Sequence, residues 1–406
     1  MSKIKIKNFG PIKDGLGNNE WLDINKVTVF IGNQGSGKST IAKVISTLTW
    51  LEKALNRGDI KSNLSKDDFF ELFKYQRINN YFKVDTLIEY EGEILSLKFD
   101  NRRSTLKLKD KLNSTYIVPK IMYVPAERNF LSVIDNPYSI KALPETLRTF
   151  AEELRKGQLE FSNKQLLLPI GNVKYEYNNN KDSSYLTGDN YEVNMLEASS
   201  GYQSFVPLFL VTKFLSDGLK PMKDKDIKNL LSIEQNVRRD KEISEINRIQ
   251  SLQEEKDKKI EAINTRYINS CFVNIVEEPE QNLFPTSQWK LLQNLLEYNN
   301  HRVGNKLILT THSPYLISYL TLLVKAGTLK SRIQTEDLKQ DLEKIVSLNS
   351  TIKSDDLSIY ELDENNGTIH ALETYNGLPS DENKLNEKLE EGNELFAQLL
   401  EIQKRL

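Results

Sequence analysis

Eight consecutive residues have the types and the spacing that hold phosphate groups. They read Gly32-Asn33-Gln34-Gly35-Ser36-Gly37-Lys38-Ser39, a complete G-x-x-x-x-G-K-S pattern. In such a loop the backbone N–H groups cradle phosphates, the lysine reaches the β- and γ-phosphates, and the serine hydroxyl ligates Mg²⁺. We therefore expect a bound nucleotide to contact Gly32, Asn33, Gln34, Gly35, Ser36, Gly37, Lys38, Ser39 and Thr40.

Two further segments carry residues suited to phosphoryl transfer. An apolar run at 272–276 leads into Glu277 and Glu278, and another at 307–310 leads into His312. Hydrolysis of a γ-phosphate requires a held Mg²⁺, an oriented water and polar groups beside the phosphate. We expect Ser39 and Glu277 to hold the metal, and Lys38, Glu278 and His312 to act in catalysis. The alternative for His312 is a helix cap without a chemical role.

A second helix start is a candidate anion site. Ser199, Ser200 and Gly201 precede an apolar stretch at 205–214 that has the length of a helix. Ser199 is the expected N-cap of that helix. The N–H groups of a helix start also bind phosphate, so these three residues are predicted to bind a γ-phosphate that reaches them from outside the first site.

Strands and helices must position these residues. The run at 27–31 predicts a strand before the phosphate loop, and helical spacing continues from Ile41 to about Leu55. Further strands are expected at 3–9, 84–90, 94–99, 104–108 and 120–125. A hairpin or loops are expected at 170–196, and a hairpin at 357–373 that turns at 364–367. Helices are expected at 139–161, 289–296, 314–324 and from Asp381 to the C-terminus.

Composition limits the function classes. The 406 residues include 55 basic and 57 acidic side chains, enough for one large α/β domain with an insertion or for two domains. A net charge of −2 provides no general attraction to nucleic acid or to an anionic membrane. The single cysteine, Cys271, excludes an intrachain disulfide, and no apolar run approaches the roughly 20 residues of a membrane span. We expect a soluble cytoplasmic protein.

Residues 221–270 differ from the rest of the chain. They contain no glycine and many charges of both signs, which favours helix strongly and coiled coil only weakly. The segment is expected to form one long helix, or an antiparallel hairpin with its tip near Arg238-Arg239-Asp240. It is either a solvated protrusion or a docking surface for a partner.

The order of these motifs resembles the ABC-type ATPases, and more closely the RecF/SMC/OLD-like branch that is found in bacterial anti-phage defence systems. The resemblance covers residues 1–50 and 120–325. Ser199 matches the signature serine, Glu277 and Glu278 the Walker B acids, residues 281–284 the D-loop, and His312 the switch histidine. Tyr202 departs from the usual signature, and Glu277 stands where aspartate is more usual.

This resemblance implies an α/β fold, with a P-loop ATPase head made of a mixed sheet core and an antiparallel β-subdomain. Residues 1–220 and 271–406 would form the head, and residues 221–270 a helical insertion between the signature and Walker B. The family's glutamine loop is not placed with certainty: Glu127 is one candidate, and Gln76 is a poorer one.

The resemblance also implies ATP and Mg²⁺ as cofactors and a homodimer or higher homo-oligomer, in which Lys38 of one chain and Ser199 of the other close on one γ-phosphate. The first functional reading is an ATP-hydrolysing switch that controls a separately encoded nuclease or toxin. The alternative is a DNA-repair or DNA-end-binding ATPase, supported only by a basic stretch at Lys98, Arg102, Arg103, Lys107, Lys109 and Lys111. A transporter subunit and a self-contained nuclease are disfavoured, and no membrane partner is expected.

Overall fold

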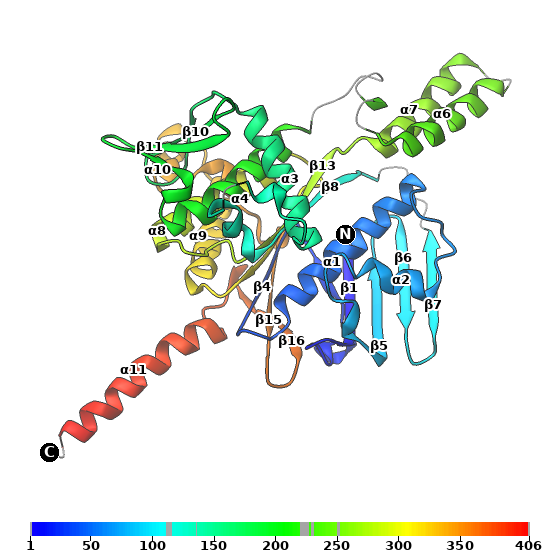
Figure 1. Ribbon diagram of the computed structural model, residues 1–406. Coiled ribbons are helices and arrows are strands. Elements are labelled where there is room, and N and C mark those ends of the chain that lie inside the picture. The colour runs from blue at the N-terminus through cyan, green and yellow to red at the C-terminus, as the bar shows by residue number, and fades with distance from the viewer. Residues whose placement is uncertain are drawn as a thin grey trace.

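The computed structural model describes residues 2–110, 116–134, 136–219, 227–228, 231–249 and 252–404. At its centre is a seven-stranded mixed sheet (Figure 1). Its strands, in spatial order, are β2 (Gly15–Leu16), β16 (Thr368–Ala371), β15 (Leu357–Leu362), β4 (Val27–Gly32), β14 (Lys306–Thr311), β13 (Cys271–Glu277) and β8 (Pro119–Val124).

The strands that carry the candidate site are parallel. β15, β4, β14, β13 and β8 all run in one direction. β4 and β13 are buried along their whole lengths, which explains why their sequences are continuous apolar runs. Because parallel strands end at the same edge of a sheet, the loops after β4, β13, β14 and β15 meet there.

One face of the central sheet packs against α1 (Lys38–Arg57). A core cluster joins Ile45 of α1, Ile308 of β14 and Ile88 of a second, antiparallel sheet, so α1 lies between the two sheets. The second sheet has the order β3-β1-β5-β6-β7. Its strands are β1 (Ser2–Phe9), β3 (Leu22–Ile24), β5 (Phe82–Glu91), β6 (Leu95–Asp100) and β7 (Thr105–Asp110), with α2 (Lys66–Leu72) beside them.

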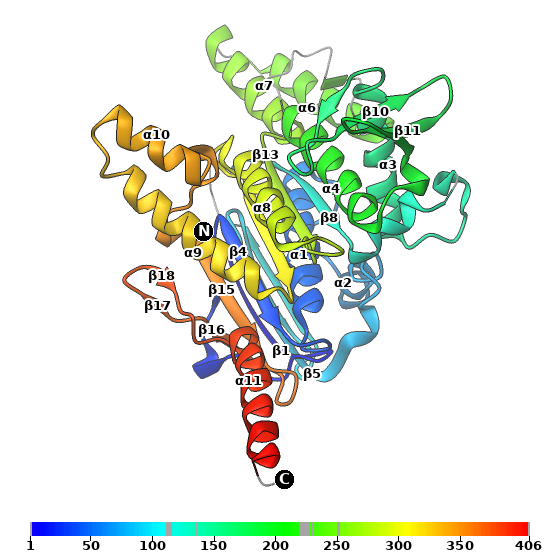
Figure 2. The same ribbon diagram turned by 90° about the vertical axis from the view of Figure 1, so that its left-hand side faces the viewer.

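The opposite face is covered by helices α3 (Glu145–Glu160), α4 (Ser200–Asp217), α8 (Pro285–Asn300) and α9 (Pro314–Lys330). Figure 2 shows α8 and α9 on this side of the sheet and α1 on the other. A small sheet of β9 (Leu166–Leu167), β10 (Lys174–Asn178), β11 (Ser183–Thr187) and β12 (Glu192–Asn194) joins the same core cluster. The expected α/β class, mixed central sheet and antiparallel subdomain are confirmed.

The helix predicted at 139–161 begins later than expected. α3 starts at Glu145, and Pro144 is its N-cap. A proline disfavours the helical conformation of the residue before it, so the helical pattern upstream of Pro144 does not become helix.

The insertion between α4 and β13 contains α6 (Ile233–Arg248) and α7 (Gln253–Tyr267). The predictions of one long helix and of a tip near residues 238–240 are wrong, because α6 runs through these residues and ends at Arg248, before α7 begins. Arg239 is fully buried and donates to Asn264 Oδ1 of α7 at 2.8 Å, while Arg238 contacts Asp59 at the end of α1 at 3.1 Å. These residues therefore hold the two helices together and attach them to α1.

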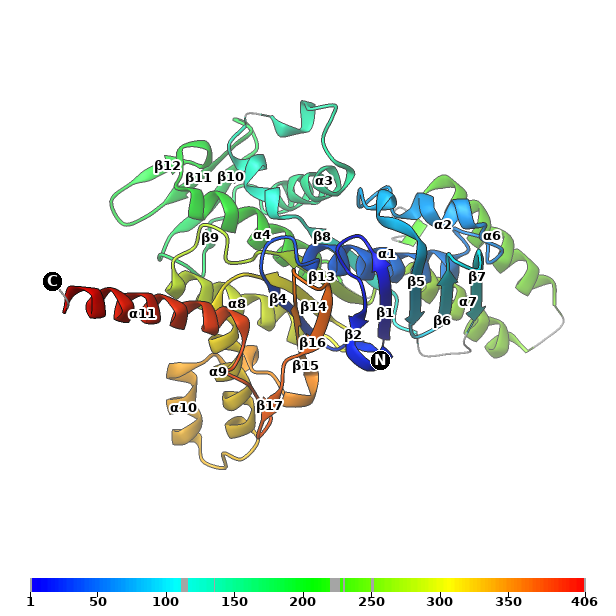
Figure 3. The same cartoon turned by 90° about the horizontal axis from the view of Figure 1, so that it is seen from below.

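The C-terminal helix α11 (Lys384–Gln403) projects away from the body of the molecule (Figure 1, Figure 3). None of its residues is buried. The remaining elements are α10 (Glu336–Ile345), β17 (Thr374–Tyr375) and β18 (Leu378–Pro379). Among the described residues, no helix combines the length and the apolar character needed to cross a membrane.

Candidate functional site

The phosphate loop lies between β4 and α1 in the position that the sequence predicts. Gly32 and Gly37 have φ angles of 141° and 106°, in a region that favours glycine. A Cβ added at Gly32 would lie 2.5 Å from the Leu362 carbonyl oxygen of β15, whereas one at Gly35 would meet nothing within 4 Å. Gly32 and Gly37 are thus required by the fold, and Gly35, with φ 75°, is favoured by its backbone conformation although it faces open space.

Lys38 is folded across its own loop. Its ammonium donates to the carbonyl oxygens of Gly32 at 2.9 Å and Asn33 at 2.8 Å, and the residue is only 6% exposed. Burial lowers the pKa of Lys38 to about 8, against the opposing effect of nearby carboxylates, of which Glu278 is the strongest. Phosphate oxygens reaching the loop would replace the two carbonyls and stabilise the charged ammonium.

The donor set at the end of β13 fits Mg²⁺. Glu277 is buried, its Oε2 accepts from the Ala126 N–H at 3.4 Å, and its Oε1 is buried without a well-formed hydrogen bond, although the buried Tyr123 hydroxyl interacts with this carboxylate. An unpaired buried carboxylate oxygen is unfavourable, and a cation would satisfy it. Ser39 is exposed on the first turn of α1. Mg²⁺ is commonly held by one or two protein oxygens together with substrate phosphates, so Glu277 and Ser39 are sufficient protein ligands.

Glu278 and His312 come from adjacent strands and lie side by side. Glu278 Oε1 is 3.7 Å from His312 Nε2. Glu278 has φ 43°, unusual for a residue other than glycine, and its N–H donates to the Thr310 carbonyl at 2.9 Å. Burial and then the charge of Lys38 lower the pKa of His312, so the imidazole is neutral at pH 7 and has one donor and one acceptor nitrogen.

Glu280 supports this pair and was not assigned a role from sequence. Its Oε1 accepts from the His312 backbone N–H at 2.7 Å, and its Oε2 is buried without a hydrogen-bond partner. Burial raises the pKa of Glu280. The proline before it in the Glu-Glu-Pro-Glu run was the only signal in the sequence that this segment turns back onto the next strand.

Arg128 is a second residue that sequence reasoning missed. It lies in the 3₁₀ segment Ala126–Ser132 after β8 and is fully buried. Its guanidinium donates to the Glu277 and Glu278 carbonyl oxygens, each at 2.7 Å.

The two candidates for the glutamine loop lie in different parts of the structure. Glu127 is exposed at this edge of the sheet, whereas Gln76 is buried and donates to Ser46 Oγ on the middle of α1 at 3.1 Å.

The predicted second anion site is exposed. Ser199 is the N-cap of α4, as the sequence predicts, although its side chain makes no capping hydrogen bond. Ser199 and Ser200 are both exposed. Gly201 packs closely on the 281–284 loop, where an added Cβ would lie 2.9 Å from the Asn282 carbonyl oxygen. The start of α4 therefore presents unpaired N–H groups to solvent.

The turn between β15 and β16 contacts the phosphate loop, which the sequence did not indicate. Asn33 Nδ2 donates to Glu364 Oε1 at 3.1 Å. The same turn holds the start of α11, because Asp363 pairs with Lys384 at 2.7 Å. Two contacts, Asn33 with Glu364 and Asp363 with Lys384, thus connect the phosphate loop to the start of the projecting helix.

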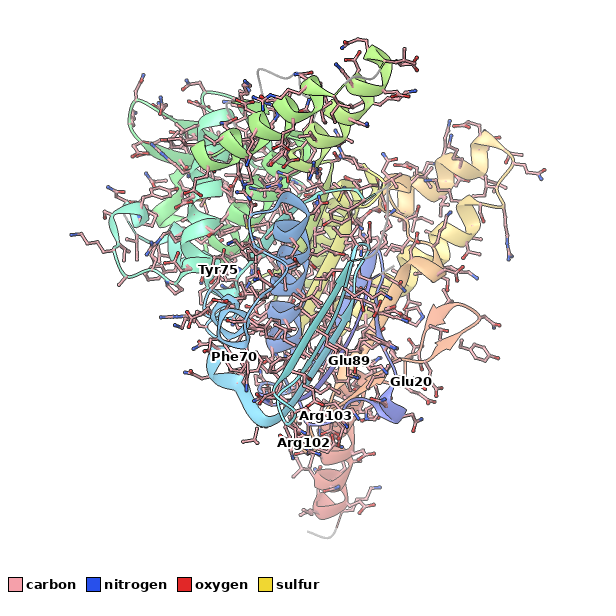
Figure 4. The ribbon with its side chains drawn as sticks, turned by 90° about the vertical axis from the view of Figure 1, so that its right-hand side faces the viewer. Glu20, Phe70, Tyr75, Glu89, Arg102 and Arg103 are labelled. Atoms are coloured by element: carbon pink, nitrogen blue, oxygen red, sulfur yellow. The ribbon has the colours of Figure 1, made fainter. Side chains whose placement is uncertain are left out.

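The basic stretch considered for DNA is partly neutralised by nearby acids. Lys98 pairs with Glu89, and Arg102 and Arg103 lie 3.7 Å from Asp85 and Asp100 respectively. Figure 4 shows Arg102 and Arg103 at the β6–β7 turn on the outer side of the antiparallel sheet. Lys111 lies outside the described residues. Three of the five described basic residues of this stretch thus lie beside acids, whereas Lys107 and Lys109 are exposed on β7.

No protein-family model and no curated protein matches the chain. Among solved structures, the chain is similar to an SMC head bound to the C-winged helix domain of ScpA, with 10% identity, 91% of this chain and 96% of that chain covered, and a TM-score of 0.41. It is similar to the SMC head domain from Thermotoga maritima, with 11% identity, coverage of 92% and 98%, and a TM-score of 0.37. A dimeric bacterial ABC transporter cassette has 11% identity, coverage of 92% and 100%, and a TM-score of 0.26. At these values the similarities add no information about the site.

Proposed function

We propose that this chain is an ATP-binding and ATP-hydrolysing switch that dimerises around ATP. One observation carries the proposal: the phosphate loop with Lys38, the carboxylate pair Glu277 and Glu278, and His312 meet at a single edge of the sheet. These are the groups that phosphoryl transfer to water requires, and they come from three different strands.

Each residue has a distinct part in the proposed reaction. Lys38 exchanges its two carbonyl partners for γ-phosphate oxygens, and His312 donates its N–H to the same phosphate. Glu278, half-exposed beside His312, orients the attacking water and accepts its proton. Ser39 and Glu277 hold Mg²⁺, which when bound neutralises charge on the β- and γ-phosphates.

The start of α4 supports the dimer. Among the residues that the structure describes, neither Ser199 nor Ser200 makes a hydrogen bond to the phosphate loop of its own chain. A second chain would supply the γ-phosphate that these exposed N–H groups bind. ATP then favours the closed pair and hydrolysis releases it, which makes the chain a switch.

In this proposal the dimer controls a separately encoded effector, a nuclease or toxin, in anti-phage defence. The resemblance of the motif order to the RecF/SMC/OLD-like branch supports this part. The test is co-expression with the products of neighbouring genes followed by phage challenge. Protection that is lost in Lys38→Ala supports the switch, and protection that survives in this variant contradicts it.

Two variants test the ATPase itself. Lys38→Ala removes the phosphate-binding ammonium and is expected to abolish ATP binding. Glu278→Gln leaves the phosphate loop intact, so it is expected to bind ATP normally while kcat falls by at least about 100-fold. Binding of a fluorescent ATP analogue and phosphate release measure the two effects. Wild-type turnover by Glu278→Gln would reject the assignment of the catalytic base.

A further inference from the structure

Arg128 is a fully buried arginine whose described hydrogen bonds all go to backbone carbonyl oxygens. Its guanidinium donates to Glu277 O at 2.7 Å, Glu278 O at 2.7 Å, Ser204 O at 3.1 Å and Pro125 O at 3.3 Å. Burial lowers its pKa to about 10, and the charges of Glu280, Glu278 and other nearby acids oppose this. The side chain therefore stays charged at pH 7 at the centre of the site.

These carbonyls belong to two different parts of the site. Glu277 and Glu278 end the strand that carries the proposed metal ligand and the proposed base, whereas Ser204 lies in the second turn of α4. A planar guanidinium with a fixed fork of donors holds several acceptors at set angles. Arg128 thus joins the end of β13 to the helix that begins with Ser200.

The left-handed backbone conformation of Glu278, with φ 43°, depends on the hydrogen bonds around it, including that from Arg128. A left-handed conformation of a residue other than glycine costs about 1–3 kcal/mol and persists only where the surroundings impose it. Here the Glu278 N–H is fixed by the Thr310 carbonyl at 2.9 Å and the Glu278 carbonyl is fixed by Arg128 at 2.7 Å. The Gln281 N–H also donates to the Glu278 carbonyl, at 3.1 Å, so Arg128 provides one of three described hydrogen bonds that fix this peptide and aim the Glu278 carboxylate.

We propose that Arg128 is a positioning residue that aims Glu278 for hydrolysis and couples the two ATP sites of the dimer. The inference rests on the proposed function. Within one chain Glu278 serves the nucleotide on its own phosphate loop, whereas the start of α4 serves the nucleotide of the other chain. Closure of α4 on the second nucleotide is therefore transmitted to Glu278 through the buried guanidinium, in addition to the contacts that Gly201 and Ser204 make with the 281–284 loop.

The test compares Arg128→Lys and Arg128→Gln with Arg239→Lys, a matched control in which the other fully buried arginine, held by Asn264 in the α6–α7 pair, is changed. Lysine keeps the charge but loses the fork of donors. For the Arg128 variants kcat is expected to fall about tenfold or more while KM for ATP changes less than about threefold. The Hill coefficient for ATP is expected to exceed 1 in the wild type and to fall to 1 in these variants.

The outcomes distinguish a failure of the Arg128 proposal from a failure of the proposed function. Wild-type kcat and Hill coefficient in Arg128→Lys would overturn the proposal, as would a Hill coefficient of 1 in the wild type. Equal effects of Arg128→Lys and Arg239→Lys on kcat would show a merely structural role, and so would failure of both Arg128 variants to bind ATP. An absence of ATPase activity in the wild-type chain would instead reject the proposed function.

Discussion

At the scale of single residues, variants of Glu280 distinguish a positioning role from a catalytic role. It contacts the backbone N–H of His312 at 2.7 Å and lies behind the site. Glu280→Ala removes this acceptor and leaves the loop before α9 free to move, so kcat is expected to fall about tenfold with ATP binding unchanged. Glu280→Gln keeps a carbonyl oxygen in the same place and is expected to retain most of the activity.

Steady-state ATPase assays of the two variants measure this difference. Equal losses in Glu280→Gln and Glu280→Ala would mean that the negative charge, and not the hydrogen bond to His312, is what the site requires. A loss of ATP binding in both would place Glu280 in the nucleotide pocket itself.

Sequence reasoning proposed the site residues that belong to motifs, and it did not propose those whose contacts depend on packing. Lys38 and Glu278 belong to motifs with fixed spacing, and the structure places them at one sheet edge with His312. Arg128 and Glu280 act on backbone groups that come from distant parts of the chain. No pattern of residue types predicts which carbonyl or N–H a buried side chain will reach.

At the scale of elements, Glu52 attaches the antiparallel sheet to α1. Its buried carboxylate accepts from the N–H groups of Ile94 at 2.7 Å and Leu95 at 3.1 Å, and from the Tyr90 hydroxyl at 2.9 Å. Glu52→Ala would leave these donors buried and unpaired, at about 1–3 kcal/mol each. We expect the free energy of unfolding to fall by at least about 2 kcal/mol, as measured by denaturant titration.

The same residue predicts a pH dependence. Burial raises the pKa of Glu52 above its ordinary value of 4.5, so the folded state binds more protons than the unfolded state above that pH. The contribution of Glu52 to stability therefore falls as pH rises from 4.5 through the raised pKa. Glu52→Gln does not titrate, and its stability relative to the wild type should increase over this window. A relative gain of the wild type would contradict the assignment.

Element boundaries were predicted where apolar patterning decides them and were wrong where tertiary contacts decide them. The continuous apolar runs of β4 and β13 follow from burial on both faces of the sheet. The charged residues near Arg239 resembled a solvated tip, yet this side chain is buried against Asn264 of α7. A charged residue in the sequence indicates an exposed side chain only when no partner in the fold neutralises it or hydrogen-bonds to it.

α11 provides a prediction about a whole helix. Because none of its residues is buried, and Leu399 for example is 62% exposed, removal of residues 389–406 should change the free energy of unfolding of the remaining chain by less than about 0.5 kcal/mol. ATP binding should also persist, since the contact of Asp363 with Lys384 remains. Thermal unfolding and nucleotide titration measure both, and a clear loss of stability would show that α11 packs against the body.

At the scale of the whole molecule, the proposed mechanism needs two chains. Each chain has one phosphate loop and one exposed α4 start, and in the proposed mechanism the two serve different nucleotides. Ser199→Arg places bulk and positive charge where the opposing nucleotide docks, without touching the chain's own Lys38. The variant is therefore expected to bind ATP as a monomer with wild-type affinity, while ATP-dependent closure and turnover are lost.

Mixing tests whether the site is shared. Ser199→Arg chains combined with Lys38→Ala chains form a heterodimer in which one site keeps both an intact phosphate loop and an intact α4 start, so ATPase activity should return although each variant alone is inactive. Phosphate release measures activity, and light scattering after size exclusion measures assembly. Wild-type hydrolysis by Ser199→Arg alone would reject the shared site. If light scattering shows heterodimers but the mixture is inactive, both sites must be intact before either one hydrolyses ATP.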